Sequence, residues 1–260
     1  MLTRFLSIPT AALAAGAVLL VAAPWTARAD DTAQSDTAQS DAAQTEVEAT
    51  TSDAAAHPNQ FRLGMYWIHS AASADDISGP FVPSGLNLSI NDMYTPYFAY
   101  VRRLSPHFEV ELAAGWPPLA KTIARGPAYL GSVPYNGQEI STARWFGPTL
   151  LFNYKVFDET HRFRPYFGIG VNYTKFYSRD STPAGNAVAG GPTSIDLPAS
   201  WGPAADFGLS YRVLDRLTVY TSYSYSYVAS RLTATTAGLV RTTHVDFGPR
   251  ALVISAGWSF

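Results

Sequence analysis

The sequence predicts an all-β protein, an eight-stranded antiparallel up-and-down transmembrane β-barrel. Three observations predict it. Apolar and polar side chains alternate with a period of two, short and long connections alternate between the segments that show this period, and charge is scarce. Charged residues are 15% of the 260 residues, whereas about a quarter is usual for a soluble domain. A small membrane barrel explains all three observations together.

The first 29 residues have the three parts of a secretory signal peptide. Arg4 supplies the positive start, Ala11 to Ala23 form an apolar run, and Ala27-Arg28-Ala29 is a small-x-small cleavage site. The alternative is a membrane anchor, but the apolar run is too short to span a bilayer. We therefore expect export through a cleaved signal peptide.

Residues 30–59 differ in composition from the rest of the chain. They contain the repeat DTAQS twice and carry seven acidic side chains within 30–56, with no base or aromatic residue there. Such a segment cannot bury enough apolar surface to offset its ordering entropy. We expect an acidic, low-complexity, disordered segment before a barrel that occupies residues 60–260.

Four strands are predicted in the first half of the barrel. Phe108 and Val110 alternate with Glu109 and Glu111, and in the fourth segment Leu151 is an apolar exception on the polar side. Successive side chains of a strand point to opposite faces, so this period indicates strands. The first two segments show it more weakly. The four segments are 61–70, 88–103, 107–117 and 141–157.

Four further strands are predicted in the second half. Tyr223, Tyr225 and Tyr227 alternate with serines, and the chain ends on Trp258-Ser259-Phe260 in the same pattern. No segment after residue 57 shows a convincing helical period. The four segments are 162–177, 200–213, 217–230 and 243–260.

The connections favour a barrel in the outer membrane. Three are short, and the others are long; an even number of strands with short turns at one rim and long loops at the other is typical of outer-membrane barrels. A soluble barrel is the alternative, with its large apolar side chains inside. The polar face, however, is rich in Gly, Ser and Thr rather than Lys and Glu, which suits a crowded lumen, and aromatic residues lie toward the strand ends, as in membrane girdles. The short connections are Leu104–Pro106, Asp158–His161 and Leu214–Arg216, and the long ones are 71–87, 118–140, 178–199 and 231–242.

Two motifs resemble a known family. PTLLFNY at 148–154 and FRPYFGIGVNYT at 163–174 are similar to segments of the OmpW family of outer-membrane proteins, as is the C-terminal stretch from Val245-Asp246-Phe247-Gly248-Pro249 to Phe260. The resemblance covers roughly 60–260 and implies an eight-stranded barrel with a narrow, partly apolar lumen. It also implies passage of small hydrophobic molecules, including alkanes, across the outer membrane. The acidic repeat departs from the family's usual short N-terminus.

The alternation places eight charged side chains inside the barrel. A cationic side chain on the lipid face would cost about 2–4 kcal/mol at the midplane, whereas inside the barrel opposite charges can pair. We expect a cluster near the short-turn end, either a salt-bridged plug or a charged gate. The eight residues are Arg62, Arg103, Glu109, Glu111, Lys155, Arg164, Asp206 and Arg212.

Toward the other end the same alternation predicts an apolar lumen. A hydrophobic solute could enter there but would meet the charged cluster, so it would have to leave sideways into the lipid. Pro148 or Pro203 could mark a weak seam in the wall, because proline removes a ladder hydrogen bond; the alternative is that each lies at a bulge or strand end. The predicted apolar path is Tyr66, Ile68, Tyr97, Trp145, Leu151 and Phe176.

Enzymatic activity is not expected, because no Ser, His and acid come together at one rim. With no cysteine, a thiolate metal site is excluded. His69 and His244 could hold a surface metal or form a weak acid–base pair, but they are better explained as ordinary loop histidines. We expect no catalytic residues, no metal and no cofactor.

The expected partners are outer-membrane lipid, small hydrophobic solutes and the barrel-assembly machinery, for which Trp258 and Phe260 form a C-terminal recognition signal. The near-neutral formal charge of −2 argues against nucleic acid as a partner. A different function remains open, in which the barrel is structural or a receptor and its long outer loops bind phage, toxin or host partners without transport.

Overall fold

The computed structural model describes residues 57–130 and 132–260. The predicted signal peptide and nearly all of the predicted acidic segment lie outside these residues. Among the described residues, no helix is long and apolar enough to cross a membrane.

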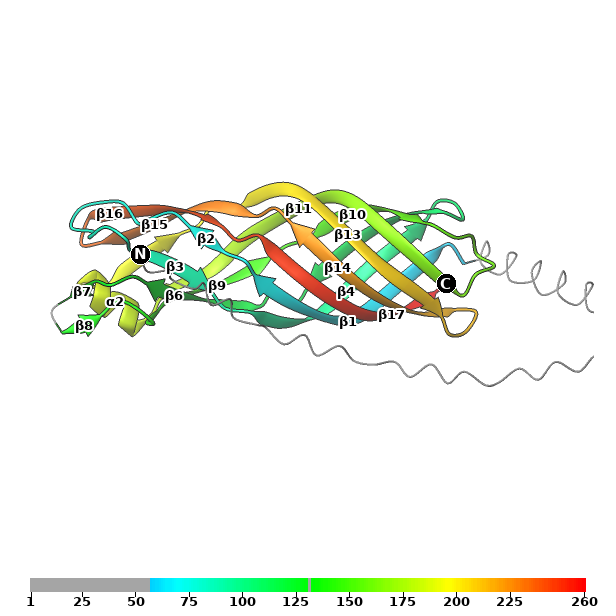
Figure 1. Ribbon diagram of the computed structural model, residues 1–260, viewed down its shortest axis with the longest axis horizontal. Helices are drawn as coiled ribbons and strands as arrows, with labels where there is room; N and C mark the ends of the chain where they lie inside the picture. Colours follow the sequence, from blue (N-terminus) through cyan, green and yellow to red (C-terminus); the bar gives the residue numbers. More distant parts are fainter. Residues whose placement is uncertain (1–56, 131) are drawn as a thin grey trace, which may run out of the picture. The chain divides into compact units, whose positions relative to one another are not determined.

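Eight antiparallel strands pair in a ring, and the pairing of β10 with β11 closes it. Each strand is tilted and pairs with its neighbours in sequence, and β1 pairs with β17 (Figure 1). The predicted eight-stranded antiparallel barrel is therefore confirmed. The ring consists of β1 (Asn59–Ser70), β4 (Met93–Arg103), β5 (Phe108–Gly115), β10 (Thr149–Lys155), β11 (Phe163–Ser181), β13 (Ser200–Arg212), β14 (Leu217–Ser226) and β17 (Pro249–Ser259).

Alternate side chains face opposite sides of the wall, as the period of two requires. In β17, Leu252, Ile254 and Trp258 are exposed, whereas Ala251 and Val253 are buried. Large apolar side chains thus cover the outer face, and small or polar ones fill the interior. This arrangement suits a wall that meets lipid on its outside.

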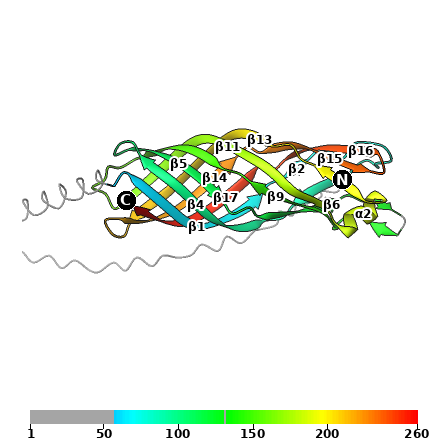
Figure 2. The ribbon, with the colours of Figure 1, turned by 180° about the vertical axis from the view of Figure 1, so that it is seen from behind.

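The wall continues beyond the ring at the end opposite the short turns. We call this the loop end, and the end with the short turns and Phe260 the short-turn end (Figures 1 and 2). The second sheet shares the end of β11 and contains β2 (Ser73–Ala74), β3 (Asn87–Ile90), β6 (Leu119–Arg125), β9 (Glu139–Phe146), β12 (Thr193–Asp196), β15 (Ala229–Thr236) and β16 (Leu239–Asp246).

Two of the four predicted long loops are more than half strand, whereas most of 71–87 and of 178–199 lies outside strands. Much of 118–140 belongs to β6 and the start of β9, and most of 231–242 is a hairpin of β15 and β16. The backbone extends the barrel because its N–H and C=O groups find partners in the neighbouring strands. A small hairpin of β7 (Tyr129–Leu130) and β8 (Val133–Pro134) is separate from this sheet.

One short helix, α2 (Pro183–Ala189), lies at the loop end. The hydroxyl of Thr182 accepts a hydrogen bond from the Gly185 N–H at 2.9 Å, and Gly190 closes the helix with φ of 86°. These are standard N-terminal and C-terminal caps. Seven residues are too few to show a helical period in the sequence, which is why the helix was not predicted.

The short turn after β10 is tied together by Asp158. Its carboxylate accepts hydrogen bonds from the Thr160 hydroxyl at 2.5 Å and from the Thr160 N–H at 3.1 Å, and it contacts His161 Nδ1 at 3.0 Å. The side-chain bonds from Thr160 and then His161 lower the pKa of Asp158 to about 2.

We therefore expect Thr160→Val to raise the pKa of Asp158, because the first of these bonds is lost. Since the folded-state pKa is depressed, the stabilisation of the turn is present above the ordinary aspartate pKa and is lost as pH falls toward the depressed value. An NMR titration of the Asp158 carboxyl carbon measures this, and an unchanged pKa in the variant would contradict the prediction.

Candidate functional site

Four charged side chains from three strands of the ring meet inside the barrel near the short-turn end. Arg62 of β1 contacts Glu109 at 3.0 Å and Glu111 at 2.8 Å, both on β5, and Lys155 of β10 contacts Glu109 at 2.6 Å. All four are at most 4% exposed. We call these four residues the ion network; its two positive and two negative charges compensate one another.

Neutral side chains complete the hydrogen bonding of the ion network. The Tyr97 hydroxyl donates to Glu111 at 2.5 Å, and Asn153 Nδ2 donates to the other Glu111 oxygen at 2.8 Å. Arg62 Nε donates to Gln60 Oε1 at 2.8 Å, and its guanidinium carbon lies 3.7 Å from the ring centroid of Tyr220. A buried ion pair is stable only with such additional partners. Together these groups obstruct the lumen at this level.

Gln60, Asn153 and Tyr220 were missed by the sequence analysis, which considered only charges and large apolar residues for the lumen. The signal was present, because each lies at an inward position of a strand, between outward-facing neighbours. A polar side chain at such a position must find a partner inside the barrel.

The other four predicted charges are not in the ion network. Arg103 pairs with Glu159 at 3.1 Å, and Arg164 donates from Nε to the Phe157 carbonyl at 2.8 Å and also bonds the Pro106 carbonyl. Arg212 is half-buried in a hollow at the short-turn end. Asp206 is buried, and its Oδ1 has no hydrogen-bond partner in the part of the chain that the structure describes. The expected cluster of eight is thus a network of four with separate groups around it.

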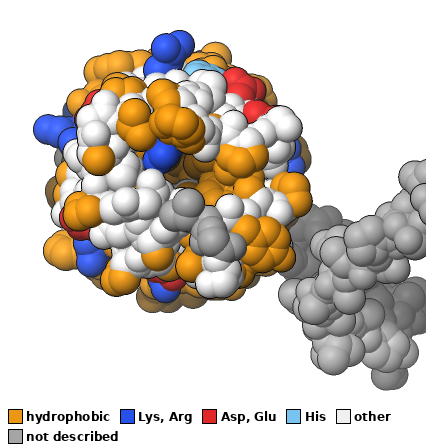
Figure 3. All heavy atoms as spheres, turned by 90° about the vertical axis from the view of Figure 1, so that its left-hand side faces the viewer, with side chains coloured by type: hydrophobic (Ala, Val, Ile, Leu, Met, Phe, Trp, Pro, Cys, Tyr) orange, Lys and Arg blue, Asp and Glu red, His pale blue; other side chains and the backbone are white. Residues whose placement is uncertain are grey.

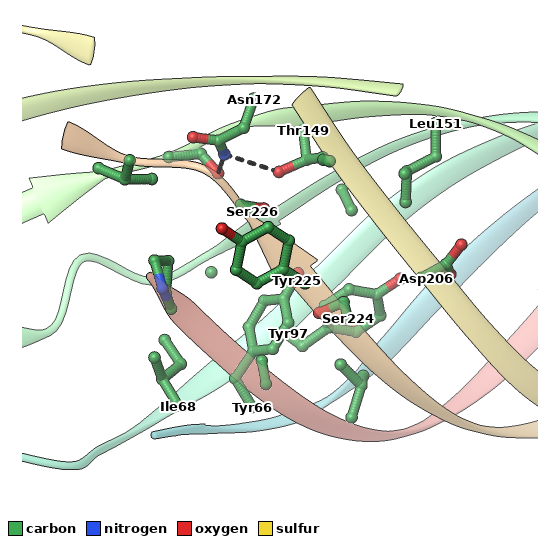
Figure 4. Close-up of a pocket in the computed structure, with 18 of the residues that line it drawn as sticks. Tyr66, Ile68, Tyr97, Thr149, Leu151, Asn172, Asp206, Ser224, Tyr225 and Ser226 are labelled. Atoms are coloured by element: carbon green, nitrogen blue, oxygen red, sulfur yellow. Dashed lines mark hydrogen bonds between the residues drawn. The ribbon is translucent and has the colours of Figure 1, made fainter. Parts of the chain in front are cut away.

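A cavity adjoins the ion network at Glu111, which is one of its lining residues, and Figure 4 shows others that line it. We use above for the direction toward the loop end. The empty space of the cavity is about 850 Å³, part of it open to solvent. Polar groups line one side, where Asn172 Nδ2 donates to Thr149 Oγ1 at 2.8 Å. We call it the lumen cavity. Five of the six residues predicted for the apolar path line it, namely Tyr66, Ile68, Tyr97, Trp145 and Leu151.

An aromatic constriction closes the top of the lumen cavity. The rings of Phe176 and Phe247 stack with centroids 5.0 Å apart, and the Trp145 ring lies 6.1 Å from Phe176 and 5.8 Å from Phe247. All three are at most 7% exposed and belong to one apolar cluster. Phe176, the sixth predicted residue, lies here rather than in the cavity wall. Phe247 was missed, because it follows the end of β16 where the alternation is lost.

Beyond the constriction, the sheet at the loop end surrounds a second and more apolar cavity. It encloses about 1130 Å³, part of it open to solvent, and Leu86, Tyr135 and Val188 are among the side chains that line it. Burial raises the pKa of Tyr135 to about 12, and the Tyr135 hydroxyl donates to the Asn87 carbonyl at 3.2 Å. Seen from the loop end, the surface is hollowed and shows hydrophobic side chains around the hollow (Figure 3). We call this second cavity the outer cavity.

The wall beside the lumen cavity has a gap in its backbone pairing. β5 pairs with β10 only as far as Ala113, and β6 pairs with β9 only from Leu119 onward. Between these points, no backbone pairing joins residues 114–118 to residues 145–148 in the part of the chain that the structure describes. We call these two segments the seam. The lumen cavity reaches it, because residues of both segments line the cavity: Gly115, Pro118, Trp145 and Gly147.

Each side of the seam is held by its other neighbour. The Trp116 N–H donates to the Pro96 carbonyl of β4 at 2.8 Å, and the Tyr173 N–H of β11 donates to the Pro148 carbonyl at 3.0 Å. A side chain crosses the seam instead of the backbone, since Arg144 Nη1 donates to the Pro117 carbonyl at 3.1 Å.

The two prolines predicted to mark a weak seam, Pro148 and Pro203, differ in their position relative to the seam. Pro148 belongs to the seam, but its backbone faces β11, so the N–H that it lacks is missing from that ladder. Pro203 pairs with Val171 of β11 and accepts from the Tyr227 N–H at 2.9 Å, which places it at the upper end of the β13–β14 ladder and away from the seam. Since backbone direction alternates along a strand, Trp116 faces β4 and Pro117 faces across the seam. Pro117 was missed, because the predicted strand was drawn through it.

The remaining predicted residues lie outside the lumen. Trp258 and Phe260 are 52% and 50% exposed at the short-turn end of the outer face. His69 Nδ1 lies 2.8 Å from Asp92 Oδ1 on the surface, and His244 is exposed. Among the described residues, no group of three or more His, Asp or Glu side chains is placed to hold a metal ion.

Comparison with known proteins identifies the kind of barrel. The sequence model of the OmpW family matches residues 59–260, which is the whole described barrel. The chain belongs to the OmpW family. It is accordingly a protein of the cell outer membrane, as the sequence predicts.

Two curated relatives share about two thirds of their own length with this chain. Outer membrane protein W of Vibrio cholerae is 29% identical over 153 residues, which are 59% of this chain and 66% of that protein. The chain thus spans just under two thirds of that relative. The dibenzothiophene metabolism operon protein PahQ of Pseudomonas aeruginosa is 30% identical over 167 residues, which are 62% of this chain and 68% of that protein.

The fold of the OmpW family is also seen in a solved structure. The crystal structure of OprG from Pseudomonas aeruginosa superposes with a TM-score of 0.69 and 22% identity, covering 78% of this chain and 95% of that one. At this identity the likeness establishes the barrel fold alone, and the role of the lumen has to be argued from its own geometry.

Proposed function

We propose that this barrel mediates passive passage of small hydrophobic molecules across part of the outer membrane, with exit sideways into the lipid. The observation that carries the proposal is the order of features along the barrel. An apolar outer cavity, an aromatic constriction and the lumen cavity follow one another, the ion network obstructs the lumen below, and the seam lies beside the lumen cavity.

The ion network argues against exit through the short-turn end. A solute moving straight down would have to separate buried pairs among Arg62, Glu109 and Glu111, and a buried charge left without its partner is strongly unfavourable. An apolar molecule offers these groups no replacement hydrogen bonds. An eight-stranded barrel also has little interior space to spare.

The seam supports exit through the wall. An intramolecular hydrogen bond contributes about 1 kcal/mol on average, so a wall that lacks several of them can part at a lower cost than its neighbours. On the outside a hydrophobic molecule meets lipid rather than water, which favours its leaving. The name of the relative PahQ, which refers to dibenzothiophene metabolism, supports an apolar aromatic compound as one kind of solute.

Two further partners belong to this proposal. The exposed apolar side chains of the outer face contact outer-membrane lipid, and Trp258 with Phe260 serves as the C-terminal signal that the barrel-assembly machinery recognises. A structural or receptor role for the loop end is the alternative that the following experiment separates from transport.

Uptake of an apolar aromatic compound into cells or liposomes that contain the barrel tests the proposal. A structural or receptor barrel would show no uptake above that of empty liposomes. In the same assay we expect Pro117→Ala to slow uptake about fivefold, because it restores one N–H facing across the seam, and one hydrogen bond of about 1 kcal/mol corresponds to that factor.

Pro148→Ala is the matched control, since the N–H that it restores faces β11 and leaves the seam unchanged. We expect uptake close to that of the unaltered barrel. Equal slowing by both substitutions, or no slowing by Pro117→Ala, would contradict exit through the seam.

A further inference from the structure

Two buried oxygen atoms below the lumen cavity lack a hydrogen-bond donor. Asn153 Oδ1 and Asp206 Oδ1 are without a hydrogen-bond partner among residues 57–130 and 132–260, and the two residues are 0% and 7% exposed. Asp206 lines the lumen cavity, beside Ser224 of the neighbouring strand (Figure 4). Buried polar groups are nearly always satisfied, so an unsatisfied pair of which one member, Asp206, lines a cavity requires an explanation.

The two oxygens face one another over Gly168 of β11. Gly168 pairs with Asn153 on one side and with Asp206 on the other, and a Cβ on Gly168 would collide with both oxygens. The glycine therefore keeps open the space that they share. Two acceptors cannot bond each other, but a single donor group between them could bond both.

Rotating the Asn153 amide does not remove the shortage. As placed, its Nδ2 donates to Glu111 Oε2 at 2.8 Å, and this bond turns its oxygen toward Asp206. After rotation the nitrogen would face Asp206, but the amide oxygen would then lie against the Glu111 carboxylate. With Asp206 ionised, either orientation leaves this group of side chains one donor short.

Charge is also unbalanced at this place. Arg62 and Lys155 compensate Glu109 and Glu111 within the ion network. Asp206 adds a further carboxylate, and Arg62 directs its donors to Gln60, Glu109 and Glu111. A positively charged donor would satisfy both the hydrogen bonds and the charge, and a hydrogen bond between charged groups is the stronger kind.

We propose that Asp206 and Asn153 form an acceptor site for the primary ammonium group of an amphipathic solute whose apolar tail occupies the lumen cavity. Leu151, Tyr66 and Val253 line the same cavity as Asp206 and would contact the tail. This proposal rests on the proposed function, because a solute must reach the lumen cavity from the loop end. It adds that the barrel selects solutes with a cationic head group and not every apolar molecule.

Direct binding to the full barrel in zwitterionic nanodiscs tests this site. Octylammonium and octanol share a chain length and differ in the head, and binding is followed by the NMR shifts of the Asn153 side-chain amide and by calorimetry. We expect octylammonium to bind at least about tenfold more tightly than octanol, since hydrogen bonds to charged groups exceed neutral ones. Asp206→Asn, which keeps the shape and removes the charge, should abolish the difference.

Asp196→Asn, at an exposed acid of β12, is the matched control and should keep the difference. Equal binding of the two probes, a preference that survives Asp206→Asn, or an infrared band of a protonated Asp206 carboxyl in the free barrel would overturn the proposal. So would displacement of octylammonium by sodium chloride at equal concentration, because the site would then hold an inorganic cation. If octylammonium binds but no apolar compound is taken up, the proposed function fails and the site stands.

Discussion

Replacing Glu111 by alanine is expected to lower the free energy of unfolding of the barrel by about 3–5 kcal/mol, the usual effect of removing one partner of a buried ion pair. Glu111 accepts hydrogen bonds from Arg62, Tyr97 and Asn153. Without it, Arg62 keeps Glu109 alone, which already pairs with Lys155. The loss comes from buried groups left without partners as well as from the missing contact.

Urea unfolding of the barrel from lipid vesicles, followed by tryptophan fluorescence, measures this change. Glu139→Ala is the matched control, because Glu139 pairs with Lys121 at 2.9 Å at an exposed place. Exposed ion pairs contribute about 0–1 kcal/mol. Similar losses for the two variants would show that the ion network is solvated and does not obstruct the lumen.

Glu111→Gln separates charge from volume. Glutamine fills the same space and still accepts a hydrogen bond, yet it leaves the positive charges of Arg62 and Lys155 with a single carboxylate between them. Because charge compensation dominates, we expect Glu111→Gln to lower the free energy of unfolding almost as much as Glu111→Ala does. Ion conductance through planar bilayers should rise in both variants, because the ion network then obstructs the lumen less completely.

The sequence was sufficient for the ring and for the side of the wall that each strand residue faces. A strand has a strict period of two, so one clear run assigns every side chain in it. The ion network was predictable for a further reason. Glu109 and Lys155 both lie within a few residues of short turns, which fix the register of adjacent strands and so bring inward charges to one level.

The loop end could not be predicted in the same way. In β15 and β16 threonines stand at both inward and outward positions, so the alternation of apolar and polar residues is lost although the strands continue. In the aromatic constriction, Trp145 and Phe176 are cross-strand partners of β9 and β11, whereas Phe247 reaches them from a distant part of the chain. The contact of Phe247 with the other two rings depends on how the strands are placed round the barrel, which no local pattern records.

The seam and the acceptor site needed the structure for another reason. The sequence Trp116-Pro117-Pro118 indicates that a strand is interrupted there. Only the pairing of the strands shows that the interruption leaves residues 145–148 without a backbone partner on that side. Asp206 was correctly placed inside, yet its lack of a donor depends on Asn153 and Gly168, which lie on two other strands. A sequence can indicate that a polar group is buried without indicating that it is unsatisfied.

Trp145→Ala is expected to speed uptake of apolar solutes several-fold, because it removes the largest of the three rings that close the constriction between the outer cavity and the lumen cavity. The substitution should also lower the free energy of unfolding by about 3–5 kcal/mol, the range for truncating a buried aromatic side chain. Uptake is therefore measured per folded barrel, counted by its resistance to unfolding in detergent gels.

Trp67→Ala is the matched control. Trp67 is 44% exposed on the outer face and stacks on Tyr94 with centroids 6.1 Å apart, so its loss changes the lipid contact but neither cavity, and uptake should stay the same. The Trp145 variant should leave ion conductance low, because the ion network below is intact, whereas the Glu111 variants should raise conductance without speeding apolar uptake. If Trp145→Ala raises both quantities together, one continuous channel runs through the barrel and exit through the seam is wrong.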